Sequence, residues 1–329
     1  MDPLSWLLEP DPSNPGVRYF ALRDLLGSRE HPAQAGRPED DPEVQQARRD
    51  VMSQGPVPQI LALQNPDGTW TPRGGGYQTT GAQVEFLAEL GADPADERVR
   101  RVGQYVLETF LAANEAFSYV TPPVPSKTVH CHNGMQAYAL LRLGFGGDPR
   151  LQAALDWQAR MATGDLLPGQ RYYKSATAAP NFTCAVNQAQ PCAWGATKAM
   201  RAFLAVPPGQ RSPALQAAIR AGADFLLSYD LAQASYPYTG KVSTHWFKLG
   251  FPLSYWSDIL ETAEVLVEAG YKDDPRLAPA LDWLRQKCDA QGRWTLEDSL
   301  NGKMWVDIEA NGRPSKWVTL RALRVLKSI

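Results

Sequence analysis

Apolar residues recur along this chain in helical periods that a repeated turn interrupts. In the clearest copies an apolar run ends at a glycine, Gly144 or Gly270, and an acidic turn leads into a second run. The second runs begin at Asp148 and Asp274, each followed by proline, and these two starts lie 126 residues apart. Glycine suits the left-handed end of a helix, whereas Asp-Pro caps and starts the next helix. The pattern therefore predicts a series of helical hairpins.

The two helices of each hairpin differ in polarity. The second helices are amphipathic, as the spacing of Leu277, Leu281 and Leu284 shows, and they pack by one face. The first helices, such as residues 135–141 and 196–204, are apolar almost all round, which predicts an inner ring covered by an outer one.

The inner candidates span about 16–26, 79–90, 131–143, 192–205, 254–268 and 315–327. The outer candidates span about 41–53, 96–112, 149–161, 213–229 and 275–288, with the short run 4–9 as a sixth. We therefore expect an all-α protein, built as a single (α/α)6 toroid with six inner and five to six outer helices. Because the repeat covers nearly the whole chain, residues 1–329 are expected to form one domain.

Two segments after outer helices combine a glutamine, a glycine turn and a tryptophan. Residues 64–70 read Gln-Asn-Pro-Asp-Gly-Thr-Trp, and residues 286–294 read Gln-Lys-Cys-Asp-Ala-Gln-Gly-Arg-Trp. Both resemble the glutamine–tryptophan repeats of the squalene cyclases. Together with the helical repeat, they indicate a resemblance to the terpenoid cyclase and protein prenyltransferase toroid superfamily. We expect these segments to join neighbouring hairpins by stacking and hydrogen bonding.

The resemblance implies an enzyme that acts on an apolar or isoprenoid-like small molecule in a central cavity. The Asp-x-Asp-Asp motif of class II terpene cyclases and the Asp-Asp-x-x-Asp motif of class I enzymes are both absent from the sequence. Cyclisation in the manner of the squalene cyclases is therefore doubtful, and a cyclase-like or transferase-like enzyme is the open expectation. A non-catalytic binding protein for an apolar ligand, or a structural toroid that recruits a protein partner, are the alternatives.

Composition and charge limit the kinds of partner that the protein is expected to bind. The formal net charge is -2 with both signs interspersed and no basic block, so the sequence does not indicate nucleic-acid binding. No run reaches the roughly 18 apolar residues of a membrane span, and the first residues lack the basic region of a signal peptide. A cytoplasmic protein is expected, and its oligomeric state is not indicated.

Candidate chemistry gathers where the inner helices begin. Cys131, Cys192 and Asp258 fall 12 to 14 residues before the ends of their respective inner runs. In a ring of parallel inner helices these positions would share one rim. Cys184 enters from the loop before Cys192 and could join the same site.

Zinc is the cofactor that this set predicts, because thiolate and imidazole are its preferred ligands. The predicted ligands are Cys131, Cys184, Cys192 and His132, with His132 and Asp258 as the catalytic candidates. Since His130 and His132 are two residues apart, they point in different directions and only one is expected to join. Asp258 can also be read simply as the cap of the following helix.

Related toroid families bind zinc with similar residues. The segment Cys131-His132-Asn133-Gly134 is similar to the Cys-His-Gly element of the lanthionine cyclases, interrupted by an asparagine. Protein prenyltransferases hold zinc with Asp, Cys and His. The alternatives for the cysteines are free thiols, a Cys184–Cys192 disulfide and an iron–sulfur cluster. Four cysteines are too few for a disulfide scaffold, and Cys288 is expected to be a buried hydrophobe.

Aromatic residues lie at or near the starts of inner helices, where they could line an apolar pocket, although core packing explains each one separately. These predicted ligand-binding residues are Tyr77, Trp194, Tyr255, Trp256 and Trp317. The expected partner is an apolar small molecule.

Overall fold

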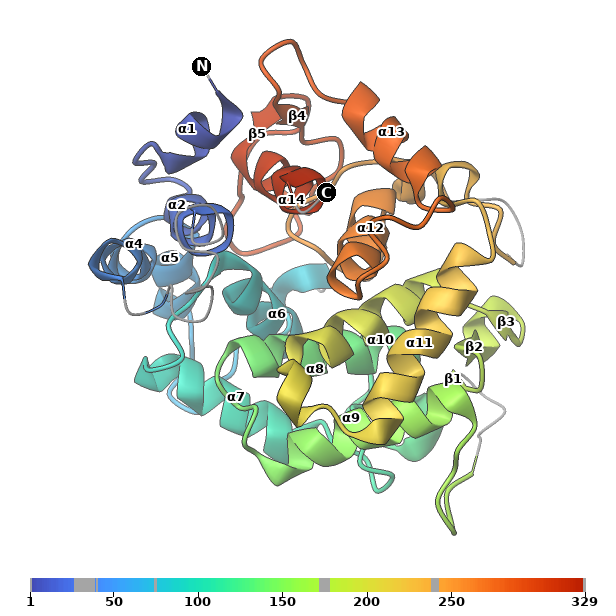
Figure 1. Cartoon of the computed structure of the whole chain (residues 1–329). Helices are drawn as coiled ribbons and strands as arrows, with labels where there is room; N and C mark the ends of the chain where they lie inside the picture. Colours follow the sequence, from blue (N-terminus) through green and yellow to red (C-terminus); the bar gives the residue numbers. More distant parts are fainter. Residues whose placement is uncertain are drawn as a thin grey trace. The chain divides into compact units, whose positions relative to one another are not determined.

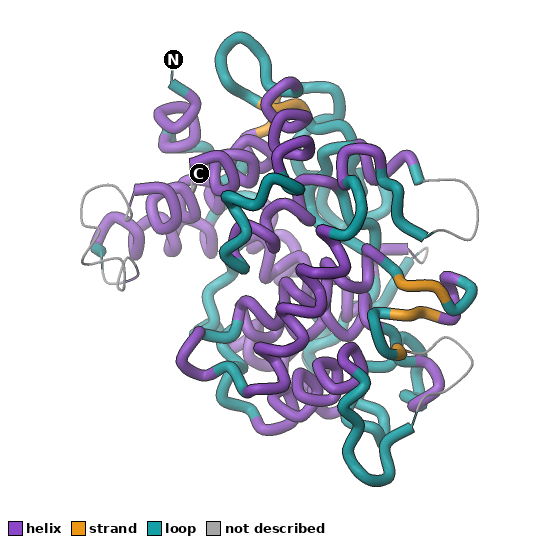
Figure 2. Tube along the Cα trace, turned by 45° about the vertical axis from the view of Figure 1, so that its right-hand side comes forward, coloured by secondary structure: helices purple, strands orange, loops and turns teal. Residues whose placement is uncertain are grey.

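Helices make up most of the backbone, and the short strands lie in connections between helices (Figure 1 and Figure 2). The computed structural model describes residues 2–26, 39, 41–73, 76–171, 178–237 and 243–327. The chain divides into two compact units. Unit 1 comprises Met1–Val102, Lys248–Leu253 and Leu281–Ile329, and unit 2 comprises Gly103–Phe247 and Ser254–Ala280. The mostly α-helical class is confirmed, whereas the closed toroid and the single domain stay predictions.

Unit 1 contains the helices from both ends of the chain. They are α1 (Pro3–Leu8), α2 (Pro15–Ala21) with a π-helical turn at Leu22–Leu26, α4 (Pro42–Ser53), α5 (Pro56–Ala62), α6 (Thr80–Leu90) and α14 (Lys316–Lys327). The strands β4 (Trp294–Thr295) and β5 (Pro314–Ser315) pair antiparallel. Two further helices, α7 (Glu97–Thr109) and α13 (Ala278–Gln286), run across the boundaries between the units.

Unit 2 contains five helices in the described part of the chain. They are α8 (His130–Arg142), α9 (Pro149–Thr163), α10 (Ala193–Ala205), α11 (Pro213–Leu227) and α12 (Ile259–Glu268). Between α9 and α10 lies a small antiparallel sheet in the order β1-β2-β3, formed by Ala178–Ala179, Thr183–Cys184 and Gln190–Pro191. Short 3-10 turns occupy Gly76–Gln78 in unit 1 and Pro125–Lys127, Ala185–Asn187, Pro208–Gln210, Leu231–Gln233 and Thr244–Phe247 in unit 2.

Most predicted helices correspond closely to those observed, because their end signals act as expected. The inner run expected at 254–268 is an exception, since its helix begins only at Ile259. Asp148 accepts a hydrogen bond from the backbone N–H of Arg150 at the start of α9, and Ser212 caps α11 in the same way. Gly91 takes the left-handed conformation at the end of α6. The helix α5 was not predicted, since its segment carries two prolines; Pro56 occupies the first position, where a missing N–H costs nothing.

The tryptophans of the two glutamine–tryptophan segments make the same hydrogen bonds. The indole N–H groups of Trp70 and Trp294 each donate to the carbonyl ten residues earlier, at 2.9 and 2.8 Å. Their backbone N–H groups donate to hydroxyls of the next inner helix, those of Thr80 at 3.1 Å and Thr319 at 3.0 Å. The expected hydrogen bonding by these segments is therefore seen within unit 1, whereas the expected stacking stays a prediction.

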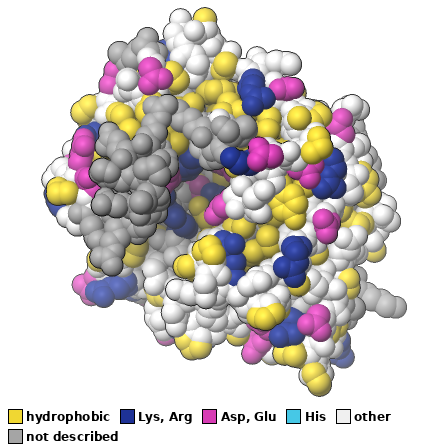
Figure 3. Space-filling view, in the orientation of Figure 1, with side chains coloured by type: hydrophobic (Ala, Val, Ile, Leu, Met, Phe, Trp, Pro, Cys, Tyr) yellow, Lys and Arg dark blue, Asp and Glu magenta, His cyan; other side chains and the backbone are white. Residues whose placement is uncertain are grey.

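Charge is distributed evenly over the visible surface. On the face that Figure 3 shows, acidic and basic side chains are interspersed among the coloured residues and neither gathers into a patch. No helix in the described ranges has both the length and the apolar character that a membrane span requires.

In unit 2, α8 and α10 approach each other closely at a glycine. A Cβ placed on Gly134 would lie 2.5 Å from the carbonyl oxygen of Lys198 and 2.8 Å from the backbone nitrogen of Ala199. Both neighbours are backbone atoms, so they cannot rotate away as a side chain could. Glycine at this position therefore permits the contact between the two helices.

Replacing Gly134 by alanine is expected to destabilise the protein by about 2–3 kcal/mol, because the helices must separate to admit the methyl group. The free energy of unfolding in urea measures the effect. Gly147→Ala serves as the control, since Gly147 is exposed and a Cβ added there would meet nothing within 4 Å. The free energy of unfolding of Gly147→Ala should differ from that of the wild type by no more than about 0.5 kcal/mol. Equal stability of both variants would contradict the close contact.

Candidate functional site

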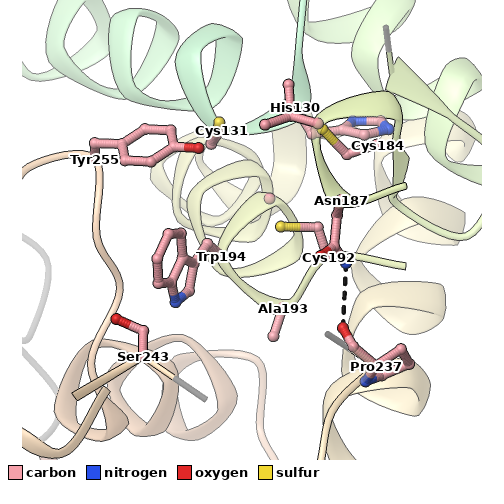
Figure 4. A pocket seen from close by; sticks show the side chains of 12 residues that line it. His130, Cys131, Cys184, Asn187, Cys192, Ala193, Trp194, Pro237, Ser243 and Tyr255 are labelled. Atoms are coloured by element: carbon pink, nitrogen blue, oxygen red, sulfur yellow. Dashed lines mark hydrogen bonds between the residues drawn. The ribbon is translucent and has the colours of Figure 1, made fainter. Parts of the chain in front are cut away.

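Three cysteines from different elements of unit 2 meet at one pocket (Figure 4). Cys131 lies in the first turn of α8, Cys184 in β2, and Cys192 directly before α10. Val129, Cys131 and Cys184 form a buried apolar cluster, and Cys192 packs against it. Cys131 and Cys192 are therefore close together, as their equivalent positions in the helical repeat predicted.

The small sheet brings Cys184 and Cys192 to the same side. Cys184 is opposite Gln190 in the pairing of β2 with β3, and the N–H of Cys192 donates to the carbonyl of Phe182 at 3.1 Å. Residues two apart on a strand share a face, so Cys184 and Cys192 are diagonal neighbours on one face. All four cysteines are free thiols, and the Cys184–Cys192 disulfide is not formed.

The connection that carries Cys184 has a strained backbone. Asn181, Phe182, Gln188 and Ala189 all have φ between 50 and 58°. Such left-handed conformations cost on the order of 1 kcal/mol each for residues other than glycine, and they persist only where the surroundings impose them. The ring of Phe182 is held between Phe225 and His130, at centroid distances of 6.3 and 5.4 Å. Burial of this ring helps to hold the connection in place.

The pocket has a volume of about 200 Å³ and a mostly apolar wall. Besides the three thiols, Val186, Ala193 and Pro237 line it, and Trp194 and Tyr255 contribute aromatic rings. Its polar lining residues are His130, Asn187 and Ser243, and no charged Asp, Glu, Lys or Arg side chain is among the described lining residues. Asn187 fastens this side of the pocket, because its Nδ2 donates to the carbonyls of Pro191 and Pro237 at 2.9 and 3.1 Å.

Three of the five predicted aromatic residues come together here. The ring of Trp194 stands edge-on to Tyr255 and to Trp256, each at a centroid distance of 5.6 Å. Trp256 in turn stacks on His245 at 4.5 Å and does not line the pocket. Trp194 and Tyr255 are thus the predicted aromatic residues that reach it.

The other two predicted aromatic residues, Tyr77 and Trp317, belong to unit 1 and do not line this pocket. Trp317 is 2% exposed, stacks on Phe251 at 4.2 Å and donates its indole N–H to Asn14. Tyr77 packs against Phe86 with its ring centroid 6.4 Å away. Trp317 is a core residue of unit 1.

Of the two neighbouring histidines, the structure brings His130 to the pocket and not His132. The Nε2 of His130 lies 3.0 Å from the carbonyl oxygen of Ala179, and a carbonyl only accepts. Nε2 therefore carries the proton. The ring of His132 instead stands edge-on to Tyr119 at 6.5 Å. Burial lowers the pKa of both histidines to about 4, so both are neutral at pH 7.

Burial also keeps the thiols of Cys131 and Cys192 protonated. It raises the pKa of Cys192 to about 11 and that of Cys131 well above its usual range, and the neighbouring thiols raise both further. The thiolate is the form that attacks electrophiles and ligates metals. At neutral pH these side chains are therefore small apolar groups.

Asp258 caps the helix α12 and does not line the pocket. Its Oδ1 accepts a hydrogen bond from the N–H of Glu261 at 2.6 Å, and the residue is 5% exposed. This capping role is the alternative that the sequence left open. A catalytic role for Asp258 or His132 stays a prediction.

A buried ion pair close to the thiols could not be recognised in the sequence. The Nζ of Lys198 on α10 lies 2.7 Å from both carboxylate oxygens of Glu261 on α12, and the two residues are 2% and 0% exposed. Lys198 is near enough to lower the pKa of Cys131, against the larger effect of burial. Arg201 stands 3.7 Å from Glu261. The pair joins α10 to α12 below the pocket wall.

Asn133, which interrupts the Cys-His-Gly element, holds the first turn of α8. Its Oδ1 accepts from the N–H of Phe117 at 2.9 Å, and its Nδ2 donates to Gln158 at 2.7 Å. Gln158 in turn donates to the carbonyl of His130 at 2.7 Å. A sequence signal for this role existed, because Asn133 precedes Gly144 by 11 residues, as Thr80 precedes Gly91.

The predicted zinc site is not supported by this arrangement. In the ranges that the structure describes, no group of three or more His, Cys, Asp or Glu side chains is placed to hold a metal ion. The cysteines share a pocket, but His132 and Asp258 point elsewhere, to Tyr119 and to the start of α12. Zinc binding stays a prediction from the sequence.

Comparison with known proteins gives matches at the level of structure. No family model matches the chain, and no curated protein sequence does. The chain is similar to a protein from Actinoplanes, at 14% identity over 96% of this chain and 90% of that chain, with a TM-score of 0.43.

The chain is also similar to the type II terpene cyclase MstE from Scytonema. A variant in complex with geranylgeranyl dihydroxybenzoate matches at 14% identity over 97% of this chain and 87% of that chain, with a TM-score of 0.46. Another, in complex with merosterolic acid A, matches at 15% identity over 97% and 86%, with a TM-score of 0.44. The superfamily named by the sequence resemblance is thus represented among these structures.

Breaking the buried ion pair is expected to be costly. Glu261→Gln leaves the Lys198 ammonium buried without its partner charge, and should lower the free energy of unfolding by about 3–5 kcal/mol. The double variant Lys198→Met/Glu261→Leu removes both charges. Its free energy of unfolding should fall by clearly less than that of the single variant. Urea denaturation measures both.

The exposed pair between Arg285 and Asp282 provides the control, because its side chains are 49% and 64% exposed. Asp282→Asn should change stability by less than about 0.5 kcal/mol. A Glu261→Gln variant as stable as this control would show that the buried charge is not held as the structure has it.

The zinc prediction is checked by elemental analysis of protein purified without added metal. A site on the three cysteines predicts about one zinc ion per chain, and loss of that zinc in Cys192→Ser. Full metal content in Cys192→Ser would remove this residue from the ligands, and a metal-free wild-type protein would end the zinc hypothesis.

Proposed function

We propose that this protein binds a small apolar molecule in the thiol-lined pocket of unit 2. The observation that carries the proposal is the pocket itself, which opens where α8 and α10 begin and has a mostly apolar wall. Ligand sites are typically concave, apolar and supplied with a few polar groups that orient the ligand. The thiols of Cys131, Cys184 and Cys192 contribute to the apolar part, as free cysteines commonly do.

The volume limits the size of the ligand. Drug-sized ligands occupy pockets of about 300–1,000 Å³, whereas an apolar cavity of about 150 Å³ holds benzene. A pocket of about 200 Å³ therefore suits a molecule somewhat larger than benzene, with about ten carbon atoms. The isoprenoid class rests on the resemblance of the glutamine–tryptophan segments, and an isoprenoid of this size has two isoprene units.

Binding is better supported than catalysis. Asp258 and His132, the predicted catalytic residues, do not line the pocket, and the carboxylate of Asp258 is engaged at the start of α12. The thiols of Cys131 and Cys192 are protonated, which disfavours a nucleophilic role for these two residues. An enzyme that uses these residues stays a prediction from the sequence.

Limonene, a cyclic hydrocarbon of two isoprene units, is a suitable probe, and isothermal titration calorimetry reports its Kd. Cys192→Phe places a ring in the pocket and should weaken limonene binding at least tenfold, because the ring occupies the ligand's volume. The thermal unfolding temperature should stay close to that of the wild type, since Cys192 is only half-buried.

The matched control is Cys288→Phe, which adds the same ring at a half-buried thiol of unit 1 that does not line the pocket. Its Kd for limonene should equal that of the wild type. Failure of limonene to bind the wild-type protein, or equal binding by Cys192→Phe, would refute the proposal.

A further inference from the structure

We infer that the ligand of this pocket carries one uncharged oxygen that accepts a hydrogen bond from the indole N–H of Trp194. This inference rests on the proposed binding function and adds the chemical class of the ligand: an alcohol or ketone with a hydrocarbon body. The hydrocarbon lies against the thiols, and the oxygen lies at the end of the pocket where Trp194 and Ser243 stand.

The indole nitrogen of Trp194 has no hydrogen-bond partner among the described residues, although it is shielded from solvent. An indole can only donate, and buried donors in folded proteins are nearly always paired. Other tryptophans of this chain follow that rule, since Trp246 donates to Leu231 at 2.8 Å and Trp305 to Gln78 at 3.1 Å. Trp194 differs from both because it lines the pocket.

One other indole nitrogen, that of Trp157, also lacks a partner in the described structure. Trp157 is 2% exposed and lies in an apolar cluster with Ala116, Met161 and Ala178. It does not line the pocket. Only the indole of Trp194 is therefore both unpartnered and placed where a ligand could reach it, among the described tryptophans.

Ser243 supplies a second polar group at the same end. Its Oγ accepts from the N–H of His245 at 3.3 Å, which engages a lone pair and leaves the hydroxyl proton to donate. In Figure 4 the indole nitrogen of Trp194 is turned toward Ser243 and away from the sulfurs of Cys131 and Cys184. The pocket thus has hydrogen-bond donors at the end with Trp194 and Ser243, whereas the thiols and the ring of His130 lie at the other end.

The charge of the lining sets the ligand class. The described residues that line the pocket include no Lys, Arg, Asp or Glu. Burying a carboxylate or diphosphate beside them without a counter-charge would be costly, whereas a neutral oxygen needs only a donor. The geometry therefore favours a neutral oxygen over an anionic head group.

Three compounds that share one ten-carbon skeleton test this inference: limonene, perillyl alcohol and perillic acid. They carry a methyl, a hydroxymethyl and a carboxyl group at the same carbon, so only the polar group varies. Trp194→Phe keeps an aromatic ring and removes the donor. Both ligands lose the same ring contacts in this variant, but only the alcohol loses a hydrogen bond. The Kd of perillyl alcohol should therefore rise about two- to tenfold more than the Kd of limonene, as expected for one neutral hydrogen bond.

Trp305→Phe is the matched control, because Trp305 is a half-buried tryptophan of unit 1 whose indole donates to Gln78. It should leave all three Kd values unchanged. Wild-type protein should bind perillic acid, as the carboxylate at pH 8, at least tenfold more weakly than perillyl alcohol. Limonene binding by Trp194→Phe also reports that this variant is folded.

The outcomes separate the two proposals. If limonene does not bind the wild-type protein, the proposed function fails. If limonene binds the wild-type protein and Trp194→Phe weakens perillyl alcohol no more than it weakens limonene, the function stands and the role of Trp194 is wrong. If perillic acid binds more tightly than the alcohol, the ligand class is wrong and the head group is anionic.

Discussion

The contact between α8 and α10 at Gly134 determines where the site can form. Because Gly134 has no side chain, the backbone of α8 lies directly against that of α10 at Lys198 and Ala199. One helical turn earlier, a Cβ added to Gly195 would lie 3.2 Å from the Cβ of His130, so the two helices are close there as well. With the helices this close, their first turns are adjacent, and Cys131 and Cys192 face a common pocket. Any larger residue at Gly134 would move one cysteine away from the other.

A charged pair is buried between α10 and α12, and its lysine is the residue whose backbone contacts Gly134. Lys198 sits where α10 is pressed against α8, so its side chain extends to α12, where Glu261 receives it with both carboxylate oxygens. Thr197 and Thr262 add a hydroxyl contact at 3.1 Å between the same two helices. A protein with hydrophobic residues of similar volume in place of such a pair is often just as stable. The pair and the strained connection around Cys184 are two features of unit 2 that general stability does not require.

One position of the repeat makes the same hydrogen bond in different copies, although the residue type at this position differs. In unit 1, threonines of inner helices accept hydrogen bonds from the backbone N–H of Trp70 and Trp294. In unit 2, Asn133 accepts from the N–H of Phe117 in the same way, and Phe117 follows a turn like that of Trp70. The asparagine that interrupts the resemblance to the lanthionine cyclases therefore performs a joining role, and its position in the repeat indicates this better than the local motif.

The sequence by itself determined most of the helices, their order and many of their ends. Hydrophobic period, Asp-Pro starts and glycine stops are local signals that act through backbone conformation and capping. Asp148 therefore caps α9 as predicted, Ser212 caps α11 in the same way, and Gly91 ends α6 in the left-handed conformation. The same repeat placed Cys131 beside Cys192. Only the tertiary structure decided which side chains join them, because adjacent residues on a helix point in different directions. His130 rather than His132 reaches the pocket, Asp258 is engaged as a cap, and the unpartnered indole of Trp194 depends on contacts between helices far apart in the chain.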